Sequence, residues 1–229
     1  MVSNFADMKR LLHISINTLE WTEGNHVWFD AKLKPGTSIE VHWGDGSYST
    51  LYYQGVKIMR RIEHYYKSVE GKERPFEIEF FAEDSDSLLE LVDGTWETKV
   101  NHANFEDCPS LSYLKYTHLQ NVDFSGCPNL MTLEASEYED STIDLSVTPC
   151  LQKLIIRCSR NLTALNLTRN PDLEELDICF CEKLQKVTVG NSSKLKIVAI
   201  EWTQIDPHSL KWLQSTVDRN GGRIQDEWL

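Results

Sequence analysis

The sequence of 229 residues lacks the short motifs that mark the commonest active sites. No segment matches G-x-S-x-G, H-E-x-x-H, the P-loop or G-x-G-x-x-G. Adjacent carboxylates such as Glu174 and Glu175 fall on a short strand, where successive side chains point to opposite faces. We therefore expect no enzymatic activity, no catalytic residue, and no metal or cofactor.

Basic and long apolar segments are also scarce. Lys and Arg number 23 against 35 Asp and Glu, and no basic cluster exceeds a pair such as Arg60 and Arg61. Nucleic acids and anionic membrane surfaces are bound through basic patches, so we expect neither as a partner. No apolar run approaches the roughly 20 residues of a membrane-spanning helix, so membrane insertion is not expected.

The first residues show no secretory signal. Segment 1–21 has no charged stretch followed by an apolar one. This pattern favours either a cytoplasmic protein or a signal that lies outside this chain.

What the sequence does contain is a repeat of 11 residues between positions 151 and 200. A leucine opens each unit, and aliphatic residues recur three and five places later; the opening residues are Leu151, Leu162, Leu173, Leu184 and Leu195. Because a strand alternates its side chains, Leu154 and Ile156 should point inward and Ile155 outward. One unit cannot bury its apolar row alone, so stacked neighbours must share one interior. We predict a solenoid whose coils of 22 residues each carry two strand-like segments.

The L-x-x-L-x-[LI] frame of these units resembles that of leucine-rich repeats, in particular the short bacterial type. The resemblance covers about residues 108–205, and the first coils after Cys108 are irregular. Asp206 and Pro207 suit the N-cap and first position of a helix, which we predict as a cap from about residue 206. Residues 223–229 are a candidate edge strand.

The N-terminal part has short alternating runs separated by turn residues, a pattern typical of an antiparallel β-sandwich. The expected strands are 11–21, 26–34, 38–43, 48–54, 57–66 and 76–82, with breaks that include 23–25 and 70–75. The fold class is therefore mainly β: an N-terminal β-sandwich, a short leucine-rich-repeat solenoid and a C-terminal capping helix. We expect the first domain over residues 1–99 and the second over residues 100–229.

Two motifs in this part resemble those of PKD-type domains, which are immunoglobulin-like sandwiches. The turn Trp43-Gly44-Asp45-Gly46 is similar to the family's W-G-D-G turn, and His64-Tyr65-Tyr66 fits its H-x-Y step. The match covers about residues 11–92 and departs from the family at the longer loop EGKERPF. Together with the repeats, the resemblance implies a cell-surface or secreted adhesin or receptor. A site formed by His42, Asp45 and His64 is the alternative to a structural role for the turn.

Six cysteines are too few for the disulfide framework of a small secreted domain. Cys158, Cys179 and Cys181 lie in or just after strand segments of successive coils. Free cysteine behaves as a small buried hydrophobe, so we interpret them as buried thiols along the solenoid. A zinc site is the alternative, although one residue separates Cys179 from Cys181 instead of the usual two to four.

The two outward sides of the coils differ in composition. Half-coils that begin at residues 119, 162 and 184 expose mostly small polar side chains. The other half-coils expose aromatic, aliphatic and charged side chains, a mixture typical of recognition surfaces. We predict that this side binds a partner through Tyr113, Lys115, Glu134, Lys153, Ile155, Arg157, Glu175, Asp177, Ile197, Glu201 and Trp202. A solvated sheet with scattered apolar residues is the alternative.

Three functions fit these observations. The leading hypothesis is a non-enzymatic module that binds a protein or a glycan, with its oligomeric state left open. The second is a structural spacer in a surface assembly. The third is an enzyme, which would need a cleft at the domain junction near His102, Asp107 and His118.

Overall fold

The computed structural model describes residues 7–18, 26–55, 58–67, 74–94, 98–191 and 193–225. The described chain is mainly β, and it divides into two compact units, residues 1–127 (unit 1) and 128–229 (unit 2). The turn expected at 23–25 and residues 70–73 of the break expected at 70–75 lie outside the described residues. The last two residues of that break belong instead to a strand that begins at Arg74.

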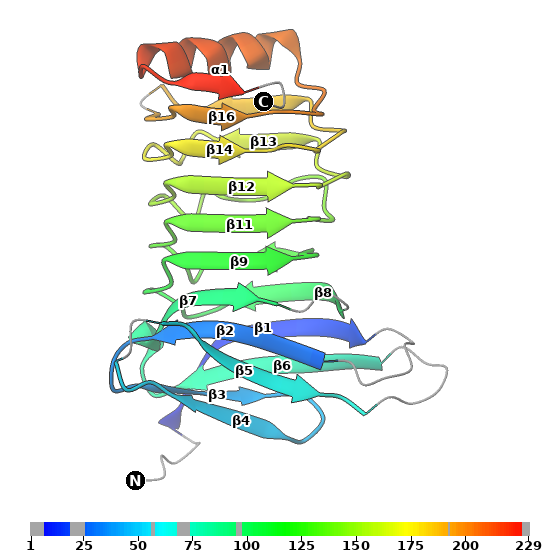
Figure 1. The fold of residues 1–229 in the computed structure, drawn as a ribbon, viewed down its shortest axis with the longest axis vertical. Helices are drawn as coiled ribbons and strands as arrows, with labels where there is room; N and C mark the ends of the chain where they lie inside the picture. The colour runs from blue at the N-terminus through cyan, green and yellow to red at the C-terminus, as the bar shows by residue number, and fades with distance from the viewer. Residues whose placement is uncertain are drawn as a thin grey trace. The chain divides into compact units, whose positions relative to one another are not determined.

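Unit 1 holds its strands in two groups (Figure 1). The first is a six-stranded sheet with the order β10 (Val122–Asp123), β8 (Thr98–Phe105), β1 (Lys9–Thr18), β6 (Arg74–Ala82), β3 (Ser38–His42) and β4 (Tyr48–Tyr52). The second, within this unit, has the order β9 (Tyr113–Thr117), β7 (Leu88–Asp93), β2 (His26–Leu33) and β5 (Arg60–Tyr65). A short helical turn, η2 (Ser85–Ser87), precedes β7.

The core of unit 1 follows from the alternation in its strands. Every second residue of β2 is buried, as the sequence predicts. Phe29 on β2 stacks on Trp43 at 6.3 Å between ring centroids and meets the edge of Phe80 on β6 at 5.1 Å. Burying a side chain of this size stabilises a fold by about 1.5–3 kcal/mol. The apolar faces of the two strand groups therefore pack on each other.

Two strands of unit 1 carry both antiparallel and parallel pairing. β7 pairs antiparallel with β2 and parallel with β9. β8 pairs antiparallel with β1 and parallel with β10, and it runs through the boundary expected between residues 99 and 100. Parallel pairing in unit 1 therefore begins on strands that also take part in its antiparallel pairing.

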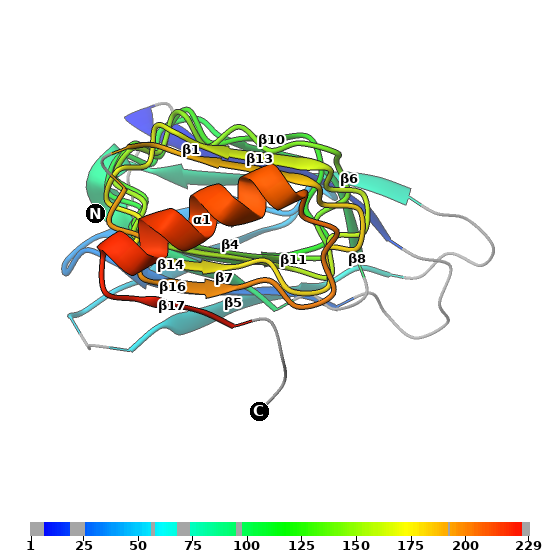
Figure 2. The ribbon, with the colours of Figure 1, turned by 90° about the horizontal axis from the view of Figure 1, so that it is seen from above.

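Unit 2 is a β-solenoid-like arrangement (Figures 1 and 2). Five strands pair in parallel in the order β11 (Thr132–Ser136), β12 (Lys153–Arg157), β14 (Glu175–Asp177), β16 (Ile197–Ala199) and β17 (Arg223–Gln225). On the other side of each coil, β13 (Ala164–Leu167) pairs in parallel with β15 (Lys186–Val189). The register aligns Leu133, Leu154, Leu176 and Val198, all fully buried. The predicted inward faces of the repeat are confirmed for these strands, and so are the outward ones apart from Asp177 on β14, which is buried.

A corner with left-handed backbone follows each of β11, β12, β14 and β16 in unit 2. The residues there have φ between 55° and 62°, although none is glycine: Glu137, Cys158, Phe180 and Trp202. Residues with a Cβ adopt this region rarely, because the side chain crowds the backbone. The turn directs the side chain away from the coil, and Cys158 and Trp202 are exposed.

The helix α1 (Pro207–Arg219) closes the last coil, as predicted (Figure 2). The carboxylate of its N-cap, Asp206, accepts hydrogen bonds from the backbone N–H groups of His208 at 2.9 Å and Ser209 at 3.0 Å. The buried face of the helix includes Leu213 and Val217. Among the described residues, no helix combines the length and the apolar character that crossing a bilayer requires.

Candidate functional site

The outward side of β11, β12, β14 and β16 in unit 2 carries most of the predicted binding residues, and we call it the strand face. Parallel register places its side chains in rows across neighbouring strands, which lie about 4.8 Å apart. One row is Lys153, Glu175, Ile197 and Arg223. The next is Glu134, Ile155, Asp177 and Ala199. Charged and apolar side chains alternate along the second row, whereas in the first row Ile197 is the one apolar residue among charged ones.

Ion pairs join neighbouring coils on the strand face. The Lys153 ammonium lies 2.8 Å from the Glu175 carboxylate. The Arg157 guanidinium donates to Asp177, with 2.9 Å between Nε and Oδ2. Since these cations lie beside carboxylates, neither pair leaves a large surface of one charge.

Asp177 differs from its prediction as an exposed residue, because its side chain is largely buried. Its Oδ1 also accepts a hydrogen bond from the backbone N–H of Cys179 at 3.2 Å. Burial alone would raise the pKa of Asp177, but the hydrogen bonds from Arg157 and Cys179 outweigh it and lower that pKa. Asp177 thus acts as an internal partner of Arg157 and of the turn that follows β14.

Ile197 and Trp202 are the most exposed large apolar residues on this side of the described part of unit 2. Ile197 is 42% exposed on β16, and Trp202 is 68% exposed at the corner after it. Trp202 stacks on Phe180, with ring planes 13° apart and centroids at 6.5 Å. The structure therefore places Trp202 with Phe180 instead of in the row of Ile197. Phe180 was not predicted as a site residue; its spacing of 22 residues from both Cys158 and Trp202 is the signal that could have identified it.

The remaining predicted binding residues lie outside the strands that form the strand face. Tyr113 and Lys115 lie on β9 of unit 1, opposite Glu90 and Val92 of β7. Glu201 follows β16, and its carbonyl accepts the backbone N–H of Phe180 at 2.8 Å.

A hollow of about 440 Å³ opens at the corners of unit 2. It is lined by Glu137, Tyr138, Glu139, Cys158, Arg160 and Asn161. Its lining offers side chains of both charges, a thiol and an amide for polar contacts. The interpretation of Cys158 as a buried thiol is wrong, because its left-handed backbone turns it to solvent.

Cys179 and Cys181 are buried free thiols, as the sequence suggests. Burial raises the pKa of Cys179 to about 12 and that of Cys181 to about 11. Both therefore stay protonated at neutral pH. Across the part of the chain that the structure describes, no three His, Cys, Asp or Glu side chains are placed to hold a metal ion.

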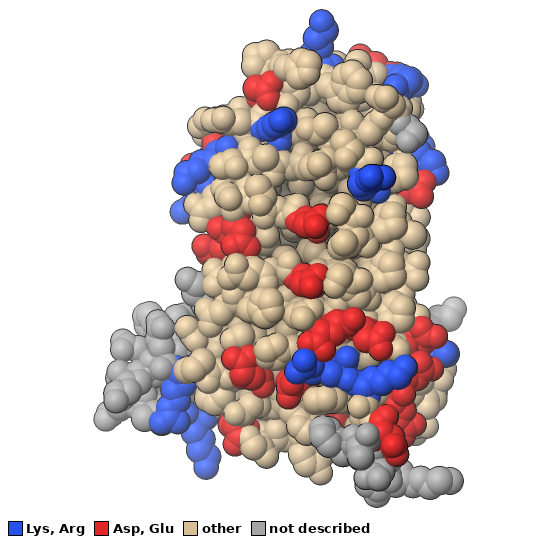
Figure 3. All heavy atoms as spheres, turned by 180° about the vertical axis from the view of Figure 1, so that it is seen from behind, with Lys and Arg blue, Asp and Glu red and all other residues tan. Residues whose placement is uncertain are grey.

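On the side of unit 2 that carries β13 and β15, some outward polar groups bond within their own turn, and Thr163 bonds to the carbonyl of Ser141 in the neighbouring coil. Asp144 accepts the backbone N–H of Ser146 at 2.9 Å, and Asn166 accepts that of Thr168 at 3.2 Å. Such bonds fix the turn in which the residue lies. Over unit 2, the view from this side shows scattered charges on a mostly uncharged surface (Figure 3). Some polar groups on this side therefore have a structural role, which is to fix the turns of the coil.

The alternative site in unit 1 is only partly assembled. His64 lies 2.8 Å from the Asp45 carboxylate, which also accepts the backbone N–H of Ser47 at 3.0 Å. His42 instead pairs with Glu40 at 2.6 Å. Trp43 stacks on the His64 ring at 5.2 Å. Asp45 and His64 thus hold the turn to β5, and His42 belongs to a different contact.

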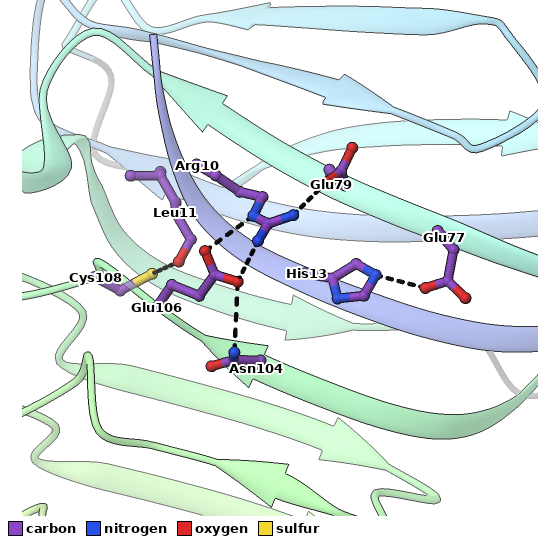
Figure 4. Close-up of polar contacts among 8 residues, drawn as sticks. All are labelled: Arg10, Leu11, His13, Glu77, Glu79, Asn104, Glu106 and Cys108. Atoms are coloured by element: carbon purple, nitrogen blue, oxygen red, sulfur yellow. Dashed lines mark hydrogen bonds and ion pairs between the residues drawn. The ribbon is translucent and has the colours of Figure 1, made fainter.

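The outer face of the six-stranded sheet pairs its own charges (Figure 4). Arg10 reaches Glu79 at 2.6 Å and Glu106 at 2.7 Å, and His13 lies 2.5 Å from Glu77. These hydrogen bonds raise the pKa of Arg10, first through Glu106 and then through Glu79. The charges on this face are therefore engaged across the strands.

The residues named for an enzyme site lie on separate elements of unit 1. His102 is on β8, with its ring 6.3 Å from that of His13. Asp107 follows β8, and His118 follows β9 with a φ of 57°.

Comparisons with known proteins give no match: no family model, no curated protein and no solved structure is similar to this chain.

Proposed function

We propose that this protein is a non-enzymatic recognition module that binds a protein or a glycan through the strand face and the corner beside it. One observation carries the proposal: the exposed Trp202, which stacks on the half-buried Phe180, adjoins a face on which Ile197 lies open between charged neighbours. Aromatic side chains supply much of the energy of protein interfaces, and surrounding charges keep such a surface soluble. The ring faces also suit the C–H groups of a sugar, since an aromatic face carries negative charge density.

We also propose a fold family for each of the two units. For unit 1 we propose a PKD-like sandwich, which is supported by the bonds that Asp45 makes to His64 and Ser47 within the W-G-D-G turn. For unit 2 we propose a leucine-rich repeat, supported by the aligned leucines of β11, β12 and β14. Together the two resemblances imply a protein of the cell surface or a secreted one, and we propose that location. A cytoplasmic location is the alternative.

The test removes the apolar groups of the strand face. The variant Ile155→Ser, Ile197→Ser, Trp202→Ser is compared with the control Arg169→Ser, Gln185→Ser, Lys186→Ser, whose exposed residues lie at or beside β13 and β15. Both are applied to an array of neutral, amino and acidic oligosaccharides and to a panel of purified extracellular proteins.

The expected result is that a ligand bound by the parent protein loses at least about tenfold in affinity with the first variant and little with the second. Equal binding by the first variant and the parent would exclude the strand face. If the parent protein bound no member of either set, a structural spacer would become the better description.

A further inference from the structure

The strand β4 forms one edge of the six-stranded sheet of unit 1 (Figure 1). Among the described strands, it pairs with β3 alone, in a regular antiparallel register from Ser38 opposite Tyr52 to His42 opposite Tyr48. A strand in this position presents unpaired backbone donors and acceptors along its free side.

The hydrogen bonds that flank β4 show which residues face the free side. Trp43 N–H donates to the carbonyl of Ser47 at 3.1 Å, and Tyr53 N–H donates to that of Thr37 at 3.0 Å. Hydrogen-bonded positions alternate along an antiparallel pair, so the backbone groups of Ser49 and Leu51 also point to β3. Those of Tyr48, Thr50 and Tyr52 then point away from the sheet.

Within its own sequence, β4 has none of the features that usually protect a free edge, and β5 of the other strand group lies close to it. Native edges carry Lys, Pro, other charges or a bulge. The strand reads Tyr-Ser-Thr-Leu-Tyr, without a charge, a proline or a shift in register. Its two tyrosines are exposed, Tyr48 by 64% and Tyr52 by 53%. By contrast, β5, the edge of the other strand group in unit 1, carries exposed Arg60, Arg61 and Glu63.

We propose that β4 binds β4 of a second copy of this chain, in antiparallel orientation about Thr50. The tyrosines lie two residues on either side of Thr50, so the two-fold pairing sets Tyr48 opposite Tyr52 of the second copy and Thr50 opposite its equivalent. The backbone N–H and C=O groups of all three residues point away from β3, so they can form hydrogen bonds with the second copy. Aromatic pairs and Thr–Thr pairs are also among the cross-strand neighbours that stabilise sheets.

Charge near β4 makes a basic extended peptide the competing occupant. A hollow of about 570 Å³ beside the strand is lined by Glu40, Glu83 and Asp84 together with Tyr52. A peptide rich in Lys or Arg would bind there more tightly at low salt. Two copies with a net charge of −12 each repel one another, so their association should instead strengthen with salt. The symmetric tyrosines favour the second copy, and salt dependence distinguishes the two occupants.

The test is sedimentation equilibrium of the full chain at low and high salt, from about 0.02 M to about 0.5 M. The parent protein should form dimers that tighten with salt. Thr50→Pro removes the outward N–H at the centre of the pairing in both copies, while an edge strand tolerates proline whose nitrogen faces solvent. This variant should weaken dimerisation at least about tenfold.

Two companion variants exclude a folding artefact. Thr50→Lys sets two like charges opposite each other and should also give monomers, whereas Thr50→Val keeps a β-branched residue and should still dimerise. Thermal melts identify a variant that has lost its fold. If either Thr50→Pro or Thr50→Lys is unfolded, the other one tests whether β4 forms the dimer. A parent protein that stays monomeric up to about 1 mM, or a dimer that persists in both Thr50→Pro and Thr50→Lys, would overturn the proposal.

Discussion

The two sides of each coil in unit 2 have the same interior and different exteriors. Leu154 and Ile156 on β12 are buried, as are Leu165 and Leu167 on β13. Outside, β12 presents Lys and Arg side chains that form ion pairs with the next coil, whereas Asn166 on β13 bonds to its own turn. The repeat thus constrains only the inward positions.

This difference separates the residues that build the coil from those available to a partner. A polar side chain that caps its own turn has a visible structural role, as Asn166 does for Thr168. Ile197 and Trp202 have no comparable structural role, since both expose large apolar groups to water. The exposed apolar groups are therefore the ones that a binding function explains best.

The largest expected effect tests whether the two interiors are equivalent. Leu176→Ala on β14 and Leu165→Ala on β13 should each lower the free energy of unfolding by about 2–5 kcal/mol, because each leaves a cavity in a packed core. Both leucines are 1% exposed or less. Urea unfolding followed by circular dichroism measures the change. A loss below about 1 kcal/mol for Leu165 alone would show that the β13 side is loosely packed.

Much of this comparison could be predicted from the sequence, for a physical reason. Leucines at a spacing of 11 residues determine which positions turn inward, and Asp206-Pro207 determines where the cap begins. Periodicity carries no information on which outward side chains meet, so the burial of Asp177 beside Arg157 was missed. It also does not reveal the backbone handedness at a corner, which exposes Cys158.

Pairing between strands was the other part that the sequence left open. The run of leucines in β7 indicates a buried strand, but it does not indicate that one edge pairs with β2 and the other with β9. Strand partners depend on distant segments, whereas alternation is a local property of the chain.

The next largest effect concerns a buried amide inside the coil. Asn170 is fully buried, and its Nδ2 donates to the carbonyls of Leu145 at 3.0 Å and Thr148 at 2.9 Å. Asn170→Ala leaves both carbonyls without this donor and should cost about 1–3 kcal/mol in urea unfolding. Asn166→Ala, at an exposed turn of the same side, is the control and should cost about 0.5 kcal/mol. Similar costs at the two sites would mean that water replaces the Asn170 amide.

A smaller effect should appear as pH dependence on the β12 side. The pKa of Asp177 is lowered in the folded protein, so its ionised form stabilises the fold above the ordinary carboxyl pKa of about 3.9. This contribution is lost as the pH falls from about 4 through the lower folded value. The free energy of unfolding of the parent should therefore exceed that of Asp177→Asn at neutral pH, with a gap that narrows in acid.

Subtracting the free energy of unfolding of Asp177→Asn from that of the parent isolates the contribution of Asp177 from those of the other acidic groups. Asp144 and Asp206 also have lowered pKa values, through hydrogen bonds from Ser146 and Ser209, but they are present in both proteins and cancel in the difference. A gap that stayed constant from pH 7 to pH 2.5, roughly the range over which carboxyl groups titrate, would remove Asp177 as its source.

The smallest effect belongs to Glu175, the residue next to Leu176 in the chain. Its carboxylate pairs with Lys153 at 2.8 Å, but both side chains are partly exposed, and such pairs contribute little once solvent and salt screen them. Glu175→Ala should change the free energy of unfolding by no more than about 0.5 kcal/mol, with less effect at high salt. A cost close to that of Leu176→Ala would mean that the pair, and not the leucine row alone, holds neighbouring coils together. The strand face would then be part of the scaffold, and fewer of its side chains would be available for a ligand.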